Sequence, residues 1–278
     1  MTRPVFVLGL GAQKAGTSWL YHYLVEAGAA FDGIKERHVW DVIEDPEMFS
    51  RFRVTEATFR RKPDSPRLPM LRLRHEMQNV EGAYARHFRA LVTRTGAALT
   101  GDLTPSYGAL SAATLARIRD TLEAAGFEIR VVFLMRDPVE RIWSAVRMER
   151  RFVANQGGDL SALPPEPDQV AAAYRAPDVA LRTRYDRTIE AIETVFAPGA
   201  VFYGLYETLF TEAELARLSR FLGVSCRPDA LGRRANATRT DAVLPPALRA
   251  EIRRHYASVY AVCAERFPDT VRLWSAPG

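Results

Sequence analysis

The sequence contains very little lysine. Of its 38 basic residues only Lys14, Lys35 and Lys62 are lysines, so the other 35 are arginines. Because arginine carries the general surface charge, a lysine is a rare choice in this chain and a candidate for a specific role. Cysteine is scarcer still: Cys226 and Cys263 cannot form a disulfide framework, and their scarcity favours a reducing compartment.

Several other features are absent. No apolar run is long enough to cross a membrane or to form the core of a signal peptide, and no long block of like charge is present. The histidines are dispersed and show no metal-binding spacing. With 47% hydrophobic and 26% charged residues, the composition excludes a disordered chain. We expect a cytoplasmic protein without a membrane span or a metal, and its net charge of +5 favours an anionic ligand.

Apolar segments alternate with helix-forming segments along the chain. Runs rich in β-branched residues predict buried strands at 5–10, 97–101, 129–135 and 200–204. Apolar residues at helical spacing predict helices at 17–27, 82–93, 115–124, 138–151, 179–196, 212–222 and 246–266. This order is typical of an α/β protein with three layers, in which helices cover both faces of a mainly parallel sheet.

Two stretches interrupt this alternation. Several prolines predict irregular structure over 31–77, and glycine and proline predict a loop or lid over 155–168. We therefore expect one domain over 1–278, with inserted or lid segments near 45–78 and 153–178.

Polar segments directly follow three of the predicted strands. They are 11–18, 102–107 and the pair Arg136-Asp137. Because ligands of such folds bind beyond the carboxyl ends of parallel strands, we expect these segments to meet at one crevice.

The loop at 9–19 reads Gly-Leu-Gly-Ala-Gln-Lys-Ala-Gly-Thr-Ser-Trp and joins the first strand to the first helix. Its small residues let backbone N–H groups approach an anion, and the helix N-terminus adds a favourable dipole. Lys14 adds a positive charge, and Thr17 and Ser18 add hydroxyl donors. The loop is therefore predicted to bind phosphate.

The loop departs from the pattern of ATP- and GTP-binding proteins. Lys14 precedes the last glycine of the loop instead of following it. The strand at 129–135 is followed by Arg136, where those proteins carry a metal-binding aspartate, and a cation there repels Mg²⁺ and attracts a further phosphate. These departures indicate a phosphorylated nucleotide that is held without a metal.

Two segments together resemble the sulfotransferases that use 3′-phosphoadenosine 5′-phosphosulfate (PAPS). Lys-Ala-Gly-Thr-Ser-Trp at 14–19 is similar to the loop that binds the 5′-phosphosulfate in that family. Arg-Asp-Pro-Val-Glu-Arg-Ile-Trp-Ser at 136–144 is similar to its 3′-phosphate motif, in which an arginine and a serine eight positions later hold that phosphate. The resemblance implies a P-loop-NTPase-like sulfotransferase fold, and the C-terminal basic segment resembles that of bacterial members.

The family's activity follows from the same resemblance. It implies transfer of a sulfonate group from PAPS to a hydroxyl, or an amine, by in-line displacement, with 3′-phosphoadenosine 5′-phosphate as product. The acceptor is expected to be a glycan or a small metabolite, and no nucleic-acid partner is expected.

The resemblance also assigns nucleotide contacts. Lys14 is expected at the bridging and sulfonate oxygens, and Arg136 and Ser144 at the 3′-phosphate. Trp19 either stacks on adenine or packs in the core, and the same alternatives hold for Tyr206, which lies in a Tyr-Glu-x-Leu segment near the nucleotide. The expected nucleotide-binding residues are Lys14, Ala15, Gly16, Thr17, Ser18, Trp19, Arg136, Ser144, Tyr206, Arg234 and Arg239. Which arginine of the C-terminal basic segment at 233–239 contacts phosphate stays open.

Lys-Glu-Arg-His-Val-Trp at 35–40 resembles a segment of glycan (heparan-type) sulfotransferases in which the glutamate is the catalytic base. Glu36 is thus the expected base, and Lys35 together with Lys14 is expected to stabilise developing charge. His38 is the alternative base, because its ordinary pKa is near 6.5. Asp102 opens a segment similar to one near the family's acceptor; it assists Glu36, binds the acceptor, or only forms a turn.

Two other functions compete with sulfotransfer. A P-loop kinase or nucleotide hydrolase is disfavoured by the position of Lys14 and by Arg136, and would depend on Mg²⁺. A non-catalytic module that binds a nucleotide or a polyanion would use the same basic residues without turning over an acceptor.

Overall fold

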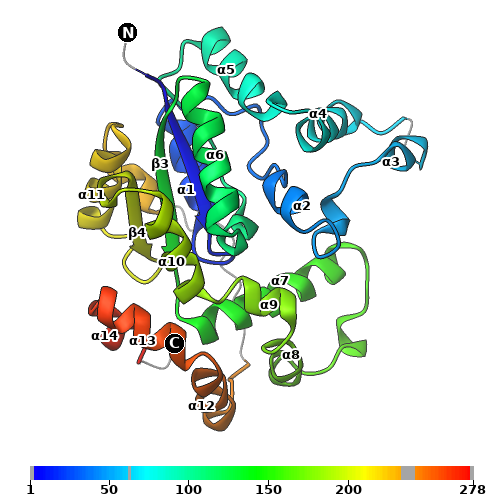
Figure 1. Cartoon of the computed structure of the whole chain (residues 1–278). Coiled ribbons are helices and arrows are strands. Elements are labelled where there is room, and N and C mark those ends of the chain that lie inside the picture. The colour runs from blue at the N-terminus through cyan, green and yellow to red at the C-terminus, as the bar shows by residue number, and fades with distance from the viewer. Residues whose placement is uncertain (1–2, 62–63, 233–241, 276–278) are drawn as a thin grey trace.

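The computed structural model describes residues 3–61, 64–232 and 242–275 (Figure 1). Its centre is a four-stranded sheet in the order β2-β1-β3-β4, and all three strand pairs are parallel. The strands are β1 (Val5–Gly11), β2 (Leu99–Asp102), β3 (Glu128–Met135) and β4 (Val201–Leu205). The described residues thus confirm the predicted α/β class and parallel sheet.

The central strands β1 and β3 are buried on both faces over most of their length because helices cover both faces of the sheet. Every residue of β1 after Val5 is buried, and β3 is buried over its last five residues. In Figure 1, α6 (Ala112–Ala124) crosses in front of the sheet and α1 (Thr17–Glu26) lies behind it. α10 (Tyr185–Val195) packs beside α6, and the Tyr23 hydroxyl lies 2.6 Å from that of Ser219 on α11 (Glu212–Leu222). The sheet therefore forms the middle of three layers.

The stretch at 31–77 contains more helix than predicted. It holds α2 (Trp40–Glu44), η1 (Ser50–Phe52), α3 (Glu56–Arg61) and most of α4 (Leu68–Asn79). α4 has Pro69 in its first turn, where a missing N–H group is tolerated. Prolines therefore separate short helices here and do not exclude them. α5 (Ala83–Thr95) follows and packs on β2.

Two predicted helices are each divided in two. The prediction at 179–196 is replaced by α9 (Pro177–Leu181) and α10, because Thr183 is buried and Arg184 leaves helical geometry. The prediction at 246–266 is replaced by α12 (Pro246–His255) and α13 (Ala257–Arg266), separated by the buried Tyr256. Neither segment between the divided helices, 182–184 or Tyr256, contains the glycine or proline that usually predicts a helix end.

α7 (Pro138–Asn155) begins directly after β3, at the carboxyl ends of the strands. The Asp137 carboxylate caps its first turn by accepting hydrogen bonds from the backbone N–H groups of Val139 and Glu140. α12 packs on α7 through two ion pairs, Arg249 with Glu140 at 2.9 Å and Arg253 with Asp137 at 3.0 Å. The remaining elements are η2 (Pro105–Ala109), η3 (Leu160–Ala162), α8 (Glu166–Ala173), η4 (Pro198–Ala200), η5 (Pro228–Gly232) and α14 (Asp269–Leu273).

Among the described residues, none of the helices combines the length and the apolar character that a membrane crossing requires. The predicted division into one domain with two inserted segments stays a prediction.

Candidate active site

A cavity of about 1290 Å³ lies beyond the carboxyl ends of β1, β3 and β4. Its walls come from the loop after β1, the segment 35–38, η1, η2, α7 and the turn after β4. Pockets for one drug-sized ligand usually measure about 300–1,000 Å³, so this cavity has room for more than one reactant. The expected meeting of the post-strand segments is therefore observed for the loop, Arg136 and η2.

The loop after β1 presents backbone N–H groups to the cavity. Gly16 has φ +96°, and a Cβ atom there would lie 2.5 Å from the side chain of Leu209, so only glycine fits. α1 begins at Thr17, and no side chain of the described residues caps it. Its first N–H groups have no partner within the helix and point toward its N-terminal end. Thr17, Ser18 and Gly16 all line the cavity, as predicted for an anion-binding loop.

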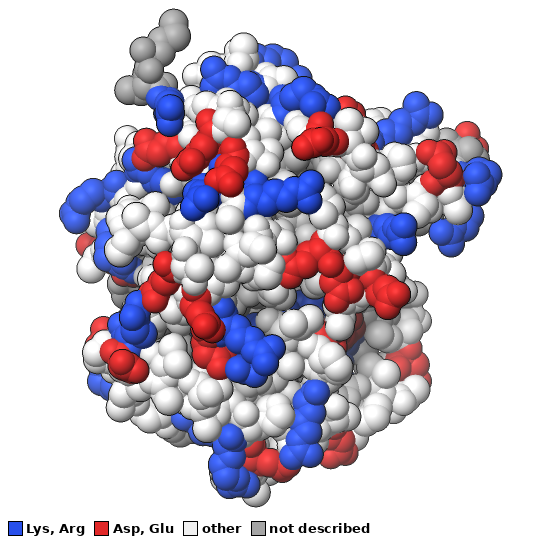
Figure 2. Space-filling model, viewed as in Figure 1, with Lys and Arg blue, Asp and Glu red and all other residues white. Residues whose placement is uncertain are grey.

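Positive charge is concentrated around Lys14. On the face shown in Figure 2, basic and acidic side chains are interspersed and form no continuous basic surface. In the cavity, by contrast, burial and the charges of Arg151, Arg136, Arg147 and Lys35, in that order, lower the pKa of Lys14 to about 8. Such mutual repulsion is unfavourable unless an anion binds among these groups.

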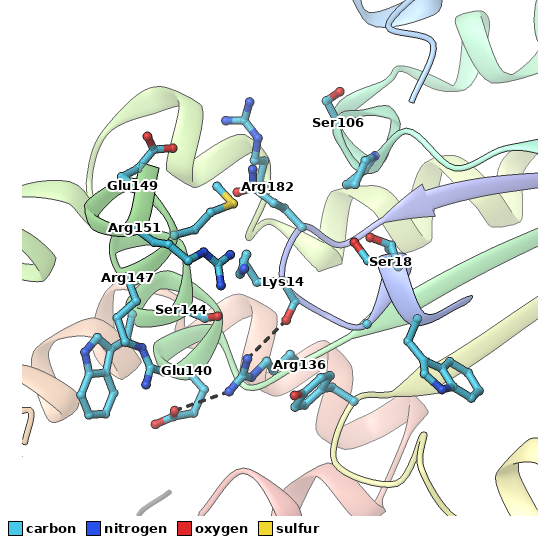
Figure 3. A pocket seen from close by; sticks show the side chains of 18 of the residues that line it. Lys14, Ser18, Ser106, Arg136, Glu140, Ser144, Arg147, Glu149, Arg151 and Arg182 are labelled. Carbon is cyan, nitrogen blue, oxygen red and sulfur yellow. Dashed lines mark hydrogen bonds and ion pairs between the residues drawn. The ribbon is translucent and has the colours of Figure 1, made fainter. Parts of the chain in front are cut away.

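Arg136 is fixed at one end of the cavity. Its guanidinium donates to the backbone oxygen of Lys14 at 3.3 Å and lies over the ring of Tyr206, 4.3 Å from the ring centre (Figure 3). Glu140 is one helical turn away, at 3.8 Å. Ser144 lines the cavity from the next turn of α7. Arg136 and Ser144, which their eight-residue spacing predicted to act together, thus line the same cavity.

Lys35 connects the phosphate loop to the expected base. Its Nζ donates to the Thr17 hydroxyl at 3.1 Å and to Glu36 Oε1 at 2.6 Å. Glu36 Oε2 lies 3.3 Å from His38 Nε2, and His38 Nδ1 lies 2.7 Å from Asp41 Oδ2. The four side chains form a continuous chain of contacts from the loop to Asp41.

The electrostatics of this chain distinguish the two candidate bases. Burial opposes ionisation of Glu36, but His38 and Lys35 outweigh it and lower the Glu36 pKa to about 2. Burial likewise opposes protonation of His38, but Asp41 and Glu36 raise its pKa above the ordinary value. The Glu36 side chain is 37% exposed and that of His38 is 6% exposed. Of the two candidate bases, Glu36 is therefore the ionised and more exposed group, whereas both His38 nitrogens face carboxylates.

Asp102 does not reach the cavity. Its carboxylate is fully buried and accepts hydrogen bonds from the hydroxyls of Thr104 at 2.6 Å, Tyr107 at 2.9 Å and Tyr84 at 3.0 Å. The Thr104 hydroxyl in turn accepts a hydrogen bond from the backbone N–H of Arg37, and the Tyr107 hydroxyl accepts one from that of Val39. The structure thus places Asp102 behind the loop that carries Glu36 and His38, and not at the wall of the cavity.

The other expected residues differ in position. Trp19 borders the cavity, but its side chain is only 4% exposed. It stacks on Tyr23, and its Nε1 donates a hydrogen bond to the backbone oxygen of Ala230. Core packing therefore covers most of its surface. Ala15 belongs to the loop but is buried and does not line the cavity. Arg234 and Arg239 lie outside the described residues.

Four arginines of the cavity wall were not predicted. Arg147 and Arg151 follow Ser144 by three and seven positions on α7, so helical periodicity from Ser144 would have identified them. Arg51 on η1 and Arg182 after α9 also line the cavity. Arg51 and Arg182 lie in no motif, and the residues around them show no pattern that predicts a position at the cavity.

Within the described ranges, no group of three or more His, Cys, Asp or Glu side chains has an arrangement that holds a metal ion.

Comparisons with known proteins concern the fold. No family model matches the sequence, and no curated protein matches it. The structure is similar to a sulfotransferase from Alicyclobacillus acidocaldarius, with a TM-score of 0.63 and 20% identity over 99% of this chain and 100% of that chain. This likeness confirms the predicted sulfotransferase fold. A weaker likeness, with a TM-score of 0.49 and 17% identity, relates 83% of this chain to 77% of a sulfotransferase domain from the curacin biosynthetic pathway.

Proposed function

We propose that the protein is a sulfotransferase that transfers the sulfonate group of PAPS to a hydroxyl, or an amine, of a glycan or small-metabolite acceptor. The observation that carries the proposal is the position of Lys35. It contacts Thr17 of the phosphate loop and Glu36 at the same time, so an ionised carboxylate lies one side chain away from an anion-binding loop. In-line sulfonate transfer needs a proton acceptor and an oxyanion site in that proximity.

The cavity residues suit PAPS. Gly16 adopts the positive φ with which the chain enters α1, so that the N-terminus of this helix lies at the cavity, and Lys14 is surrounded by cations that an anionic ligand would neutralise. Arg136 and Ser144 suit a second phosphate, since a guanidinium binds phosphate oxygens in pairs. When bound, PAPS supplies an activated sulfonate on a phosphate leaving group.

Each remaining role follows from a contact of this chain. Glu36 accepts the proton of the attacking hydroxyl, and its depressed pKa keeps it ionised at neutral pH. His38 orients Glu36 from Oε2, and Asp41 holds His38 from the other ring nitrogen. Lys14 and Lys35 stabilise the charge that develops on the leaving oxygen. Arg136 disfavours a kinase, because a Mg²⁺ ion beyond β3 would meet its guanidinium.

The test is product formation. The purified protein is incubated with PAPS and a panel of hydroxyl and amine acceptors, and adenosine 3′,5′-bisphosphate is quantified by chromatography. We expect acceptor-dependent release, lost in Lys14→Ala and retained in Arg94→Ala, which removes an exposed basic residue at the end of α5. Undiminished release by Lys14→Ala would contradict the mechanism, and transfer from ATP with Mg²⁺ in its place would establish a kinase.

A further inference from the structure

The cavity has a second cationic end that the proposed chemistry does not use. In Figure 3, Arg136 and Glu140 lie at one end, Arg182 and Ser106 lie at the other, and Lys14 lies between them. Arg51 also lines the cavity. We call Arg51 and Arg182 the outer arginine pair.

Arg182 is a nearly buried guanidinium with a weak counter-charge. Its side chain is 9% exposed, and its Nη1 lies 3.2 Å from the carboxylate of Asp178, which is itself 55% exposed. Burial first, and then the charge of Arg51, lower the pKa of Arg182, and they outweigh Asp178 and Asp41. A buried arginine near a second arginine is stabilised by an oxyanion that contacts both.

Arg51 lies over the aromatic ring that stacks on His38. Its guanidinium lies over the ring of Phe52, 4.6 Å from the ring centre, and that ring stacks on His38 with centres 3.4 Å apart and planes 7° apart. His38 in turn contacts Glu36. Among the described residues, no carboxylate lies within 4 Å of the Arg51 guanidinium. The Phe52 ring therefore lies between the Arg51 guanidinium and His38, the residue proposed to orient Glu36.

The outer arginine pair comes from segments that carry no phosphate-binding motif. Arg51 lies on η1, within the stretch expected to be inserted, and Arg182 lies directly after α9. The nucleotide contacts are already provided by the loop after β1 and by Arg136 at the opposite end. The pair thus faces the part of the cavity that the acceptor would occupy on the Glu36 side.

From this arrangement we infer that the acceptor carries its own oxyanion, a carboxylate or a phosphate ester, which Arg51 and Arg182 bind while its hydroxyl faces Glu36. This inference rests on the proposed function and names the substrate class: a negatively charged hydroxy compound. Two guanidinium groups suit such an anion because each presents paired N–H donors to two oxygens. Phe52 supplies an apolar wall beside the reacting group.

The test compares three hexoses that differ in charge. Glucose, glucuronate and glucose 6-phosphate are titrated by calorimetry into protein saturated with adenosine 3′,5′-bisphosphate, which keeps the probes out of the nucleotide site. We expect one or both charged hexoses to bind at least roughly tenfold more tightly than glucose, as expected for hydrogen bonds to charged groups. The preferred hexose identifies carboxylate or phosphate as the recognised group.

Variants assign the preference to the pair. Arg51→Gln, Arg182→Gln and the double variant should reduce the preference for charge, and the double variant should abolish it. Arg53→Gln is the matched control, because Arg53 is exposed beside η1 and does not line the cavity. If Arg182→Gln does not fold, Arg51→Gln alone decides, because Arg51 is exposed and its replacement leaves the core intact.

Outcomes separate this inference from the proposed function. A charge preference that is lost in the variants, without any sulfonate transfer, supports the anion site and contradicts the sulfotransferase. Binding of glucose as tightly as both charged hexoses, no binding of either charged hexose, or a preference that survives the double variant overturns the anion site. If the anion site is overturned in this way, the proposed sulfotransferase activity can still be tested with neutral acceptors.

Discussion

The two ends of the cavity are built in different ways. At the end proposed to bind the nucleotide, called the nucleotide end, Lys14, Arg136 and Tyr206 follow β1, β3 and β4 within a few residues, so strand pairing fixes where they lie. At the end proposed to bind the acceptor, called the acceptor end, Arg51 and Arg182 belong to η1 and to the turn after α9, which lie outside the sheet. The nucleotide end therefore depends on the sheet register and the acceptor end on the packing of short helices. Changes at one end should leave the other intact.

The largest expected effect tests the residue that lies between the two ends. Glu36→Gln should reduce turnover roughly 10²- to 10⁴-fold, the usual contribution of a positioned general base. Its affinity for adenosine 3′,5′-bisphosphate should stay within about twofold, because the phosphate loop is unchanged. Steady-state kinetics and calorimetry measure the two quantities. The assignment is wrong if His38→Ala abolishes turnover while Glu36→Gln is mild.

A smaller effect separates the two ends directly. Arg136→Ala should weaken the binding of adenosine 3′,5′-bisphosphate roughly 10- to 100-fold, since hydrogen bonds to a charged group are lost. Arg51→Gln should instead raise the KM of a charged acceptor. Calorimetry on both variants checks this division, and a loss of nucleotide affinity in Arg51→Gln as large as in Arg136→Ala would show that the ends are not independent.

The hydrogen bonds of Asp102, behind the loop that carries Glu36, should contribute measurably to the free energy of unfolding. Asp102→Asn replaces an acceptor of three hydroxyl donors with a group that is partly a donor, and should lower the free energy of unfolding by about 1–3 kcal/mol. Urea denaturation measures this loss. Turnover should fall at unchanged nucleotide affinity, because the loop and not the phosphate site is loosened. Unchanged stability would contradict the role assigned to the hydrogen bonds of Asp102.

The smallest predicted effect is a pH dependence at the nucleotide end. Because the pKa of Lys14 is lowered from 10.5 to about 8, its charge is lost as pH rises through 8, well before an ordinary lysine loses its charge. Affinity for adenosine 3′,5′-bisphosphate should therefore decline above pH 8, by at most about tenfold per pH unit. Lys14→Arg should remove this decline, since arginine keeps its charge. A flat profile for the unaltered protein from pH 7 to 9.5 would contradict the lowered pKa.

The same contrast explains what the sequence could predict. Continuous apolar runs identify the strands, and residues directly after them must meet at one edge, so Lys14, Arg136 and Tyr206 were accessible to sequence reasoning. Arg147 and Arg151 follow from helical periodicity and were missed only because the motif ends at Ser144.

The acceptor end was not predictable. Arg51 and Arg182 lie at the cavity because Phe52 of η1 stacks on His38 and α9 packs on η2, and no local pattern records such long-range packing. The break at Tyr256 escaped prediction for a similar reason, because burial of a large side chain ends α12 without glycine or proline. Asp102 was found as a motif residue, but only its burial and hydrogen bonds show that it lies behind the loop and does not line the cavity.

The most direct test of the account is a comparison of nucleotides by calorimetry. Adenosine 3′,5′-bisphosphate and ATP are titrated into the protein, each with and without Mg²⁺. Because Arg136 suits a 3′-phosphate and repels a metal beyond β3, the bisphosphate should bind roughly tenfold to hundredfold more tightly than ATP, with or without Mg²⁺. Tighter binding of ATP that requires Mg²⁺ would contradict the account and indicate a P-loop kinase.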